Sequence, residues 1–325
     1  MKNCACSRDN YDLYASHAWY VPGIKGLFAL WALILVGTIL SFALEHFLKT
    51  FLSKDVVENY ATLVSDPLIY LPAMIYVFLR SRHNRLLKTG YKPNSSHFCP
   101  FKVWQIALIT VALAYAYFIV SDWINYWYFK LTLLVPGLKY MYDLITEVMK
   151  EETFGPFWVC FITTAVYAAI FEEWLCRGIL LRGLLAKMSP LWAIVISALF
   201  FSLIHMNPWQ GLNAFLFGLM IGYVYYKTGS LWLTMLLHLI NNETVVVLAQ
   251  IPSLRETEWI MDMMPLATFV VVYVLAVVAL LACLMAFRRI PLEHKRGNID
   301  AVLNPQGAHG VEDGKDSNAY VSENG

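Results

Sequence analysis

Apolar stretches long enough to cross a bilayer recur along most of the chain and alternate with short polar segments. A helix needs about 20 apolar residues to cross the hydrocarbon, so this pattern is typical of a polytopic membrane protein. We predict an all-α transmembrane helix bundle of about eight spans. The spans are Ile24–Leu44, Thr62–Leu79, Val103–Val120, Phe157–Leu175, Leu191–His205, Leu212–Tyr226, Leu231–Leu248 and Ala267–Phe287.

Two of these spans raise questions of continuity and depth. The second is the least regular, because Asp66, Pro67 and Pro72 interrupt it. The fourth places Glu172 near one end of its span, whereas His205 lies at the opposite end of the fifth. If these two residues act together, the fourth helix has to continue well beyond Leu175, and we expect that it does.

The basic residues indicate the orientation. Of the 24 Lys and Arg residues, 18 fall in the loops that share a side with the N-terminus and 6 in the loops of the other side. Cytoplasmic loops are enriched in Lys and Arg. We therefore expect both termini to be cytoplasmic, which agrees with an even number of spans.

The chain divides into three predicted regions. Residues 1–154 form an N-terminal transmembrane region that ends in an amphipathic connector on the membrane surface, Asp122–Thr153. Residues 155–289 form a second transmembrane region, which carries the polar motifs discussed below. Residues 290–325 are polar, and we expect them to be a disordered tail.

Composition agrees with a membrane protein and limits its partners. The chain is 59% hydrophobic and only 14% charged, which is too apolar for a soluble domain. The net charge is +1 and no basic run occurs, so we expect the lipid bilayer rather than nucleic acid as a partner. Six scattered cysteines, of which only Cys4 and Cys6 are close in sequence, are a weak metal signal.

Three of the predicted spans carry polar side chains at helical spacing. Each ionisable group at the centre of a membrane helix costs about 2.5–3.5 kcal/mol on insertion scales, so such groups normally face the bundle interior and have a function. Two carboxylates, an arginine, two histidines and an amide together are typical of a hydrolase. They lie in the segments Glu172–Arg177, Phe201–His205 and His238–Asn242.

The two neighbouring glutamates point in different directions. Glu173 and Arg177 are four residues apart and share a helix face, so we expect a structural ion pair. Glu172 points about 100° away from that face. A carboxylate without such a partner, inside a bundle, is suited to act as a general base; the alternative is an acid that is only structural.

The histidines differ in how strongly they point to function. His205 ends an apolar run, where a histidine is as often an interfacial polar residue as a catalytic one. His238 lies inside a span, and Asn242 follows at i+4 on the same face. This pair can serve a pocket or simply tie two helices together. Asn241 is offset from that face, so the spacing favours Asn242.

Together these groups predict hydrolysis of a carbonyl compound. A carboxylate and one histidine can activate a water, and the second histidine and the amide can stabilise the resulting oxyanion. The same residues also match a His₂Glu zinc site, although no H-E-x-x-H motif is present. Zinc therefore stays possible, and we favour the metal-free reaction.

The three segments resemble the CPBP family, which comprises CAAX prenyl endopeptidases and bacterial Abi or bacteriocin-processing relatives. The family is marked by E-E-x-x-x-R, F-x-x-x-H and H-x-x-x-N, which here are Glu172-Glu173…Arg177, Phe201…His205 and His238…Asn242. The resemblance covers about Phe157 to Thr244.

The resemblance implies an eight-helix intramembrane protease. It implies that Glu172 and His205 activate water, that His238 and Asn242 form the oxyanion site, and that Glu173 and Arg177 support them. The expected substrate is a membrane-associated or lipid-modified peptide or protein, and leader peptides or signal remnants would fit a multi-pass protein of a bacterial cell membrane.

Two alternatives remain. A non-catalytic membrane scaffold or immunity protein of the same fold would use the polar cluster for packing. A transporter would show a repeat of broken helices in two halves, and the sequence has no such repeat.

Overall fold

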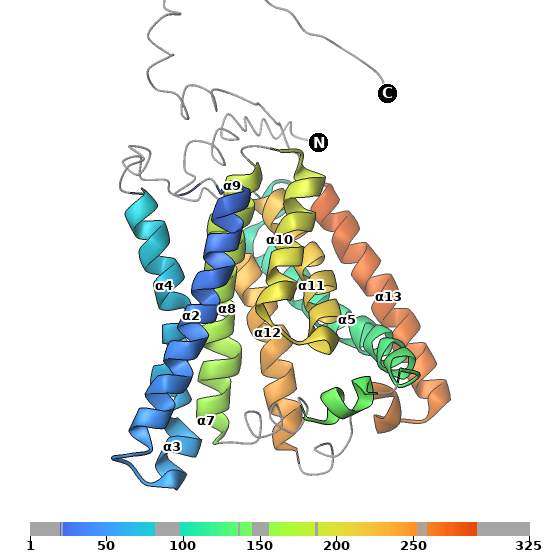
Figure 1. Ribbon diagram of the computed structural model, residues 1–325. Coiled ribbons are helices and arrows are strands. Elements are labelled where there is room, and N and C mark those ends of the chain that lie inside the picture. Colours follow the sequence, from blue (N-terminus) through green and yellow to red (C-terminus); the bar gives the residue numbers. More distant parts are fainter. Residues whose placement is uncertain are drawn as a thin grey trace, which may run out of the picture.

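The computed structural model describes residues 20, 22–81, 98–135, 137–144, 156–185, 188–251, 254 and 259–290. In these residues the protein is an all-α polytopic helix bundle without strands, as predicted (Figure 1). Its elements are α2 (Ile24–Leu48), α3 (Lys54–Tyr60), α4 (Thr62–Ser81), α5 (Val103–Thr132), α7 (Phe157–Cys160), η3 (Phe161–Tyr167), α8 (Ala168–Glu173), η4 (Trp174–Leu181), α9 (Arg182–Leu185), α10 (Pro190–Ile204), α11 (Pro208–Thr228), α12 (Leu231–Gln250), η5 (Ile260–Met263) and α13 (Leu266–Arg288).

Each of the eight predicted spans corresponds to a helix, but not every helix is long and apolar enough to cross a membrane. Within the described part of the chain six are: Ile24–Leu48, Thr62–Arg80, Val103–Thr132, Phe157–Leu185, Leu231–Gln250 and Leu266–Arg288. The apolar helix α10 has only 15 residues, and α11 is not among the six. The number of crossings and the side of each terminus therefore stay predictions.

The segments α7, η3, α8, η4 and α9 follow one another without a break and form one helix, the 157–185 helix. It continues ten residues past Leu175, as we expected. Two of its segments, Phe161–Tyr167 and Trp174–Leu181, are π-helical and flank α8 on both sides. Short π-helical insertions often occur at functional sites, and here they enclose the two glutamates.

Helices α10 and α11 form a hairpin whose turn lies part way along the neighbouring helices (Figure 1). Helix α10 starts with Pro190 at its first turn and is about 22 Å long, shorter than the hydrocarbon of about 30 Å. At the turn, Asn207 caps α11 by accepting from the backbone N–H groups of Trp209 and Gln210. Glu172 lies about 20 Å from the C-terminal end of the 157–185 helix, and His205 lies about 22 Å from the N-terminal end of α10. These two ends follow each other in the chain, so the two residues reach a similar depth.

The third predicted span is shorter than the helix that contains it, and its surface connector stays a prediction. Residues Asp122–Thr132 continue α5, which is 30 residues long, because the apolar pattern of that helix runs on past Val120. Residues 145–155 and the predicted disordered tail, 291–325, lie outside the described residues.

Helix α4 contains both Pro67 and Pro72 and is nevertheless continuous. A proline has no N–H and leaves the carbonyl four residues earlier without its helical partner. For Pro67 that carbonyl belongs to Leu63, and Tyr167 of the 157–185 helix donates its O–H to it at 3.2 Å. The irregularity noted in the sequence thus joins two helices.

Two close helix contacts depend on glycine. A Cβ on Gly37 of α2 would collide with the backbone carbonyl of Ile69 in α4. A Cβ on Gly218 of α11 would lie 2.9 Å from Cα of Ala198 in α10. Small residues let membrane helices approach closely, and these two glycines set the spacing of the α2–α4 and α10–α11 pairs.

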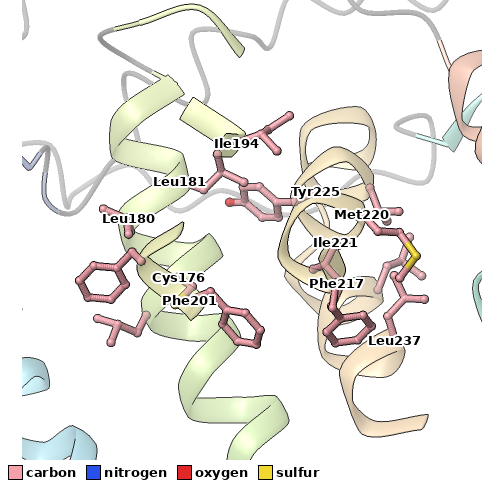
Figure 2. Close-up of a cluster of buried hydrophobic side chains, with 14 of the residues drawn as sticks. Cys176, Leu180, Leu181, Ile194, Phe201, Phe217, Met220, Ile221, Tyr225 and Leu237 are labelled. Carbon is pink, nitrogen blue, oxygen red and sulfur yellow. The ribbon is translucent and has the colours of Figure 1, made fainter. Parts of the chain in front are cut away.

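The apolar core lies between the 157–185 helix and helices α10, α11 and α12. Figure 2 shows that its side chains point toward one another from these helices. The labelled members are Cys176, Leu180, Leu181, Ile194, Phe201, Phe217, Met220, Ile221, Tyr225 and Leu237. Since Phe201 and Phe217 also contact the histidines of the candidate site, this core holds that site in place.

Candidate active site

Glu172, in α8, stands at the centre of the polar cluster. Its Oε1 accepts a hydrogen bond from the O–H of Tyr70 in α4 at 2.8 Å. Its Oε2 lies 3.9 Å from Nε2 of His205 and 3.9 Å from Nε2 of His238. Among the described residues Oε2 has no hydrogen-bond partner. The cluster therefore presents one carboxylate oxygen to two imidazole nitrogens.

The other nitrogen of each imidazole ring has an acceptor. Nδ1 of His205 lies 2.7 Å from the carbonyl oxygen of Phe201, and Nδ1 of His238 lies 3.0 Å from Oε1 of Glu173. A carbonyl only accepts, so Nδ1 of His205 carries the hydrogen. In a neutral ring Nε2 is then an acceptor, and in His205 this lone pair faces the Glu172 side.

Glu173 and Arg177 form the expected ion pair. Nη1 of Arg177 donates to Oε1 of Glu173 at 2.7 Å, and both side chains are completely buried. Nη2 of Arg177 donates to the carbonyl of Gly218 at 3.3 Å, which links the pair to α11. Because Glu173 Oε1 also faces His238, the ion pair orients that ring as well as neutralising a carboxylate.

Phe201 joins the ion pair to both histidines. Its ring lies 4.4 Å from the guanidinium carbon of Arg177, a cation–π contact. It also makes T-shaped contacts with His205 at 4.9 Å and His238 at 5.6 Å between ring centres. Phe201, the aromatic residue of the F-x-x-x-H segment, thus packs against the ion pair and both histidines.

Asn242, in α12, has other neighbours in this structure. Its Nδ2 donates to the carbonyl of Thr164 at 2.8 Å, and its Oδ1 accepts from Asn241 at 3.1 Å. An amide nitrogen carries two hydrogens, so at most one remains for a substrate. The roles of all the predicted site residues stay predictions.

Tyr70 was not among the predicted site residues. This residue lies 102 positions before Glu172 and outside all three motifs. A tyrosine inside an apolar span was its only signal, and many other tyrosines of the chain share it. The contact between His238 and Glu173 was missed too, since spacing relates residues only within one helix.

The donor types match the zinc site considered above, but their spacing does not. Two ligands of one tetrahedral zinc lie about 3.4 Å apart, whereas Oε2 of Glu172 is 3.9 Å from each Nε2. In the part of the chain that the structure describes, no group of three or more His, Cys, Asp or Glu residues has the spacing of a metal site.

Comparison with known proteins places this cluster in a family. Residues 154–244 match the family model described as type II CAAX prenyl endopeptidase Rce1-like. No curated protein and no solved structure matches the chain. The matched segment contains the Glu172, His205 and His238 motifs, and it lies within a multi-pass helix bundle. Over this segment the chain is similar to type II CAAX prenyl endopeptidases, which supports the resemblance to the CPBP family of intramembrane proteases seen in the sequence.

Proposed function

We propose that this protein is a membrane endopeptidase in which Glu172 and His205 activate a water molecule and His238 and Asn242 stabilise the oxyanion. The substrate is a peptide bond of a membrane-associated or lipid-modified peptide or protein. The proposal refines the peptidase activity that the family implies. The observation that carries it is the approach of Glu172 Oε2 to both imidazole Nε2 atoms, each at 3.9 Å.

In the first step the water donates its hydrogens to Glu172 Oε2 and His205 Nε2, which both accept. As the water oxygen attacks the scissile carbonyl carbon, one proton moves to this pair. A positioned acid or base contributes about 10²–10⁴-fold to such a step. The hydrogen bond from Nδ1 of His205 to Phe201 keeps Nε2 free to accept.

The attack places negative charge on the carbonyl oxygen. His238 donates to this oxygen from Nε2 when the ring is doubly protonated, because Nδ1 already faces Glu173. In that state the positive charges of His238 and Arg177 equal the negative charges of Glu172 and Glu173. The second hydrogen of Asn242 Nδ2 supplies the other donor. Collapse of the intermediate then breaks the C–N bond, and the proton held by Glu172 and His205 passes to the leaving amine.

The test compares Glu172→Gln with the wild type, both reconstituted in liposomes, on a farnesylated peptide that ends in a CAAX sequence. We expect the variant to lose about 10³–10⁴-fold in kcat and to keep its unfolding temperature. Proteomics of terminal fragments from cells that express each form extends the test to natural substrates. Equal cleavage by both forms would contradict the proposal, and full activity of Glu172→Gln in cells would favour the scaffold alternative.

A further inference from the structure

Resting on the proposed function, we propose that Tyr70 is a positioning residue for Glu172. Tyr70 belongs to α4, outside the segment that matches the family model. Its phenol holds one oxygen of the general base so that the other faces the reaction. The active site is then completed by the N-terminal region of the chain rather than by the matched segment alone.

The two oxygens of Glu172 have separate tasks. Oε1 accepts from the O–H of Tyr70 at 2.8 Å. Oε2 lies at 3.9 Å from each histidine Nε2 and has no hydrogen-bond partner among the described residues. A carboxylate on a flexible side chain rotates freely unless one oxygen is fixed. The phenol of Tyr70 fixes Oε1, and this hydrogen bond sets the direction in which Oε2 points.

Tyr70 is itself held in place by the residue next to Glu172. Its ring stacks on Phe171 with centres 5.3 Å apart and planes at 15°. Phe171 in turn contacts Tyr167 at 5.7 Å, and Tyr167 donates to the Leu63 carbonyl that Pro67 leaves free. Helix α4 is therefore joined to the 157–185 helix at Leu63 as well as at Tyr70, and the phenol has little freedom to leave Glu172.

A tyrosine suits this task better than a shorter polar side chain. It has two side-chain torsions, a large apolar surface for the stack and an O–H at its tip. The close approach of α4 to α2 at Gly37 and Ile69 fixes the helix one residue before Tyr70. Because ring, helix and partner are all constrained, small changes at the phenol should reach the catalytic oxygen.

The experiment removes only the phenol oxygen, in the Tyr70→Phe variant, and measures kcat and KM on the farnesylated CAAX peptide. The stack on Phe171 remains, so the fold should be kept. A misplacement of about 1 Å at the reacting group costs about 10²-fold, so we expect kcat to fall about 10- to 100-fold. KM should stay within about twofold of the wild-type value, a split that a general loss of packing would not give.

The matched control is Tyr117→Phe. Tyr117, in α5, is buried and, like Tyr70, donates its O–H to a side chain, Asn213 Oδ1, at 2.8 Å. Loss of the Tyr117 phenol oxygen should leave kcat within about threefold of the wild-type value. A folded Tyr70→Phe enzyme with kcat in that same range would overturn the inference, as would equal losses in the two variants.

Two further variants separate the possible failures. If Glu172→Gln still cleaves, the proposed function is wrong. If Glu172→Gln is inactive and Tyr70→Phe is fully active, only the positioning role is wrong. Should Tyr70→Phe not fold, Phe171→Leu takes its place, since it removes the stack and keeps the O–H. A lower kcat at constant KM in Phe171→Leu supports the role, and an unchanged kcat refutes it.

Discussion

The two sides of α8 hold neighbouring glutamates in different surroundings. On the ion-pair side, defined by Glu173 and Arg177, both charged side chains are 0% exposed and contact each other at 2.7 Å. On the water side, defined by Glu172 and His205, the side chains are 12% and 13% exposed and lie 3.9 Å apart. One side is closed and held by direct contacts. On the other side the side chains stay slightly exposed, and Glu172 Oε2 accepts no hydrogen bond from the described residues.

The difference indicates how one helix turn serves two purposes. A buried charge needs a partner at short range, and Glu173 has one. A general base needs access to water and substrate, and the slight exposure of the Glu172 side agrees with that need. We therefore expect changes on the ion-pair side to affect mainly stability and changes on the water side to affect mainly kcat.

The sharpest test of this comparison is Arg177→Leu. It leaves the carboxylate of Glu173 buried without its cation, which costs about 3–5 kcal/mol. Thermal unfolding in detergent measures the loss, and Glu172→Gln is the control that should change stability by less than about 1 kcal/mol. Similar unfolding temperatures for Arg177→Leu and Glu172→Gln would remove the distinction between the two sides.

The second test concerns the oxyanion donors on α12. Asn242→Ala removes the proposed donor and should lower kcat about 10²–10³-fold, measured on the farnesylated peptide. Asn241→Ala removes only the hydrogen bond to Oδ1 of Asn242, so we expect a loss below about tenfold. Equal losses in these two variants would mean that the pair acts through helix packing.

The third test alters the support of the ion-pair side. Gly218→Ala adds a methyl 2.9 Å from Cα of Ala198 and pushes apart α10 and α11. Overpacking of this kind costs about 1–3 kcal/mol, and the carbonyl of Gly218 also moves away from Arg177. The unfolding temperature gives the effect. Gly23→Ala is the control, because a methyl there meets no atom within 4 Å.

The smallest expected effect belongs to Phe201→Leu, which lies between the two sides. The variant loses the cation–π contact with Arg177 and the T-shaped contacts with both histidines. Such contacts are not additive and contribute about 0.5–2 kcal/mol, and the leucine side chain replaces part of the lost packing. We expect a modest fall in both unfolding temperature and kcat. A fall in only one of these quantities would assign Phe201 to one side alone.

The helices and the ion pair were predictable because both depend on local sequence. Apolar length predicts a membrane helix, and spacing of four residues predicts the contact between Glu173 and Arg177. The end of α5 was not predicted, since the predicted surface segment began at the polar Asp122. Asp122 instead accepts from the backbone N–H of Ile260.

The contacts between helices could not be predicted from one sequence. Nothing in the spacing of residues shows that Tyr70 approaches Glu172, or that His238 faces Glu173 as well as Glu172. The π-helical segments were unpredictable too, because their widened turns arise from packing in the bundle. These segments alter the direction of side chains that an ideal helix would place by counting.

The proline at position 67 changes the usual expectation for such a residue. In an ordinary helix, replacing a proline by alanine restores a backbone hydrogen bond and adds stability. Here the Leu63 carbonyl already accepts from the Tyr167 phenol, so the restored N–H of residue 67 would have to share this acceptor. The stability gained by α4 as an isolated helix would thus come at the atom that joins α4 to the 157–185 helix.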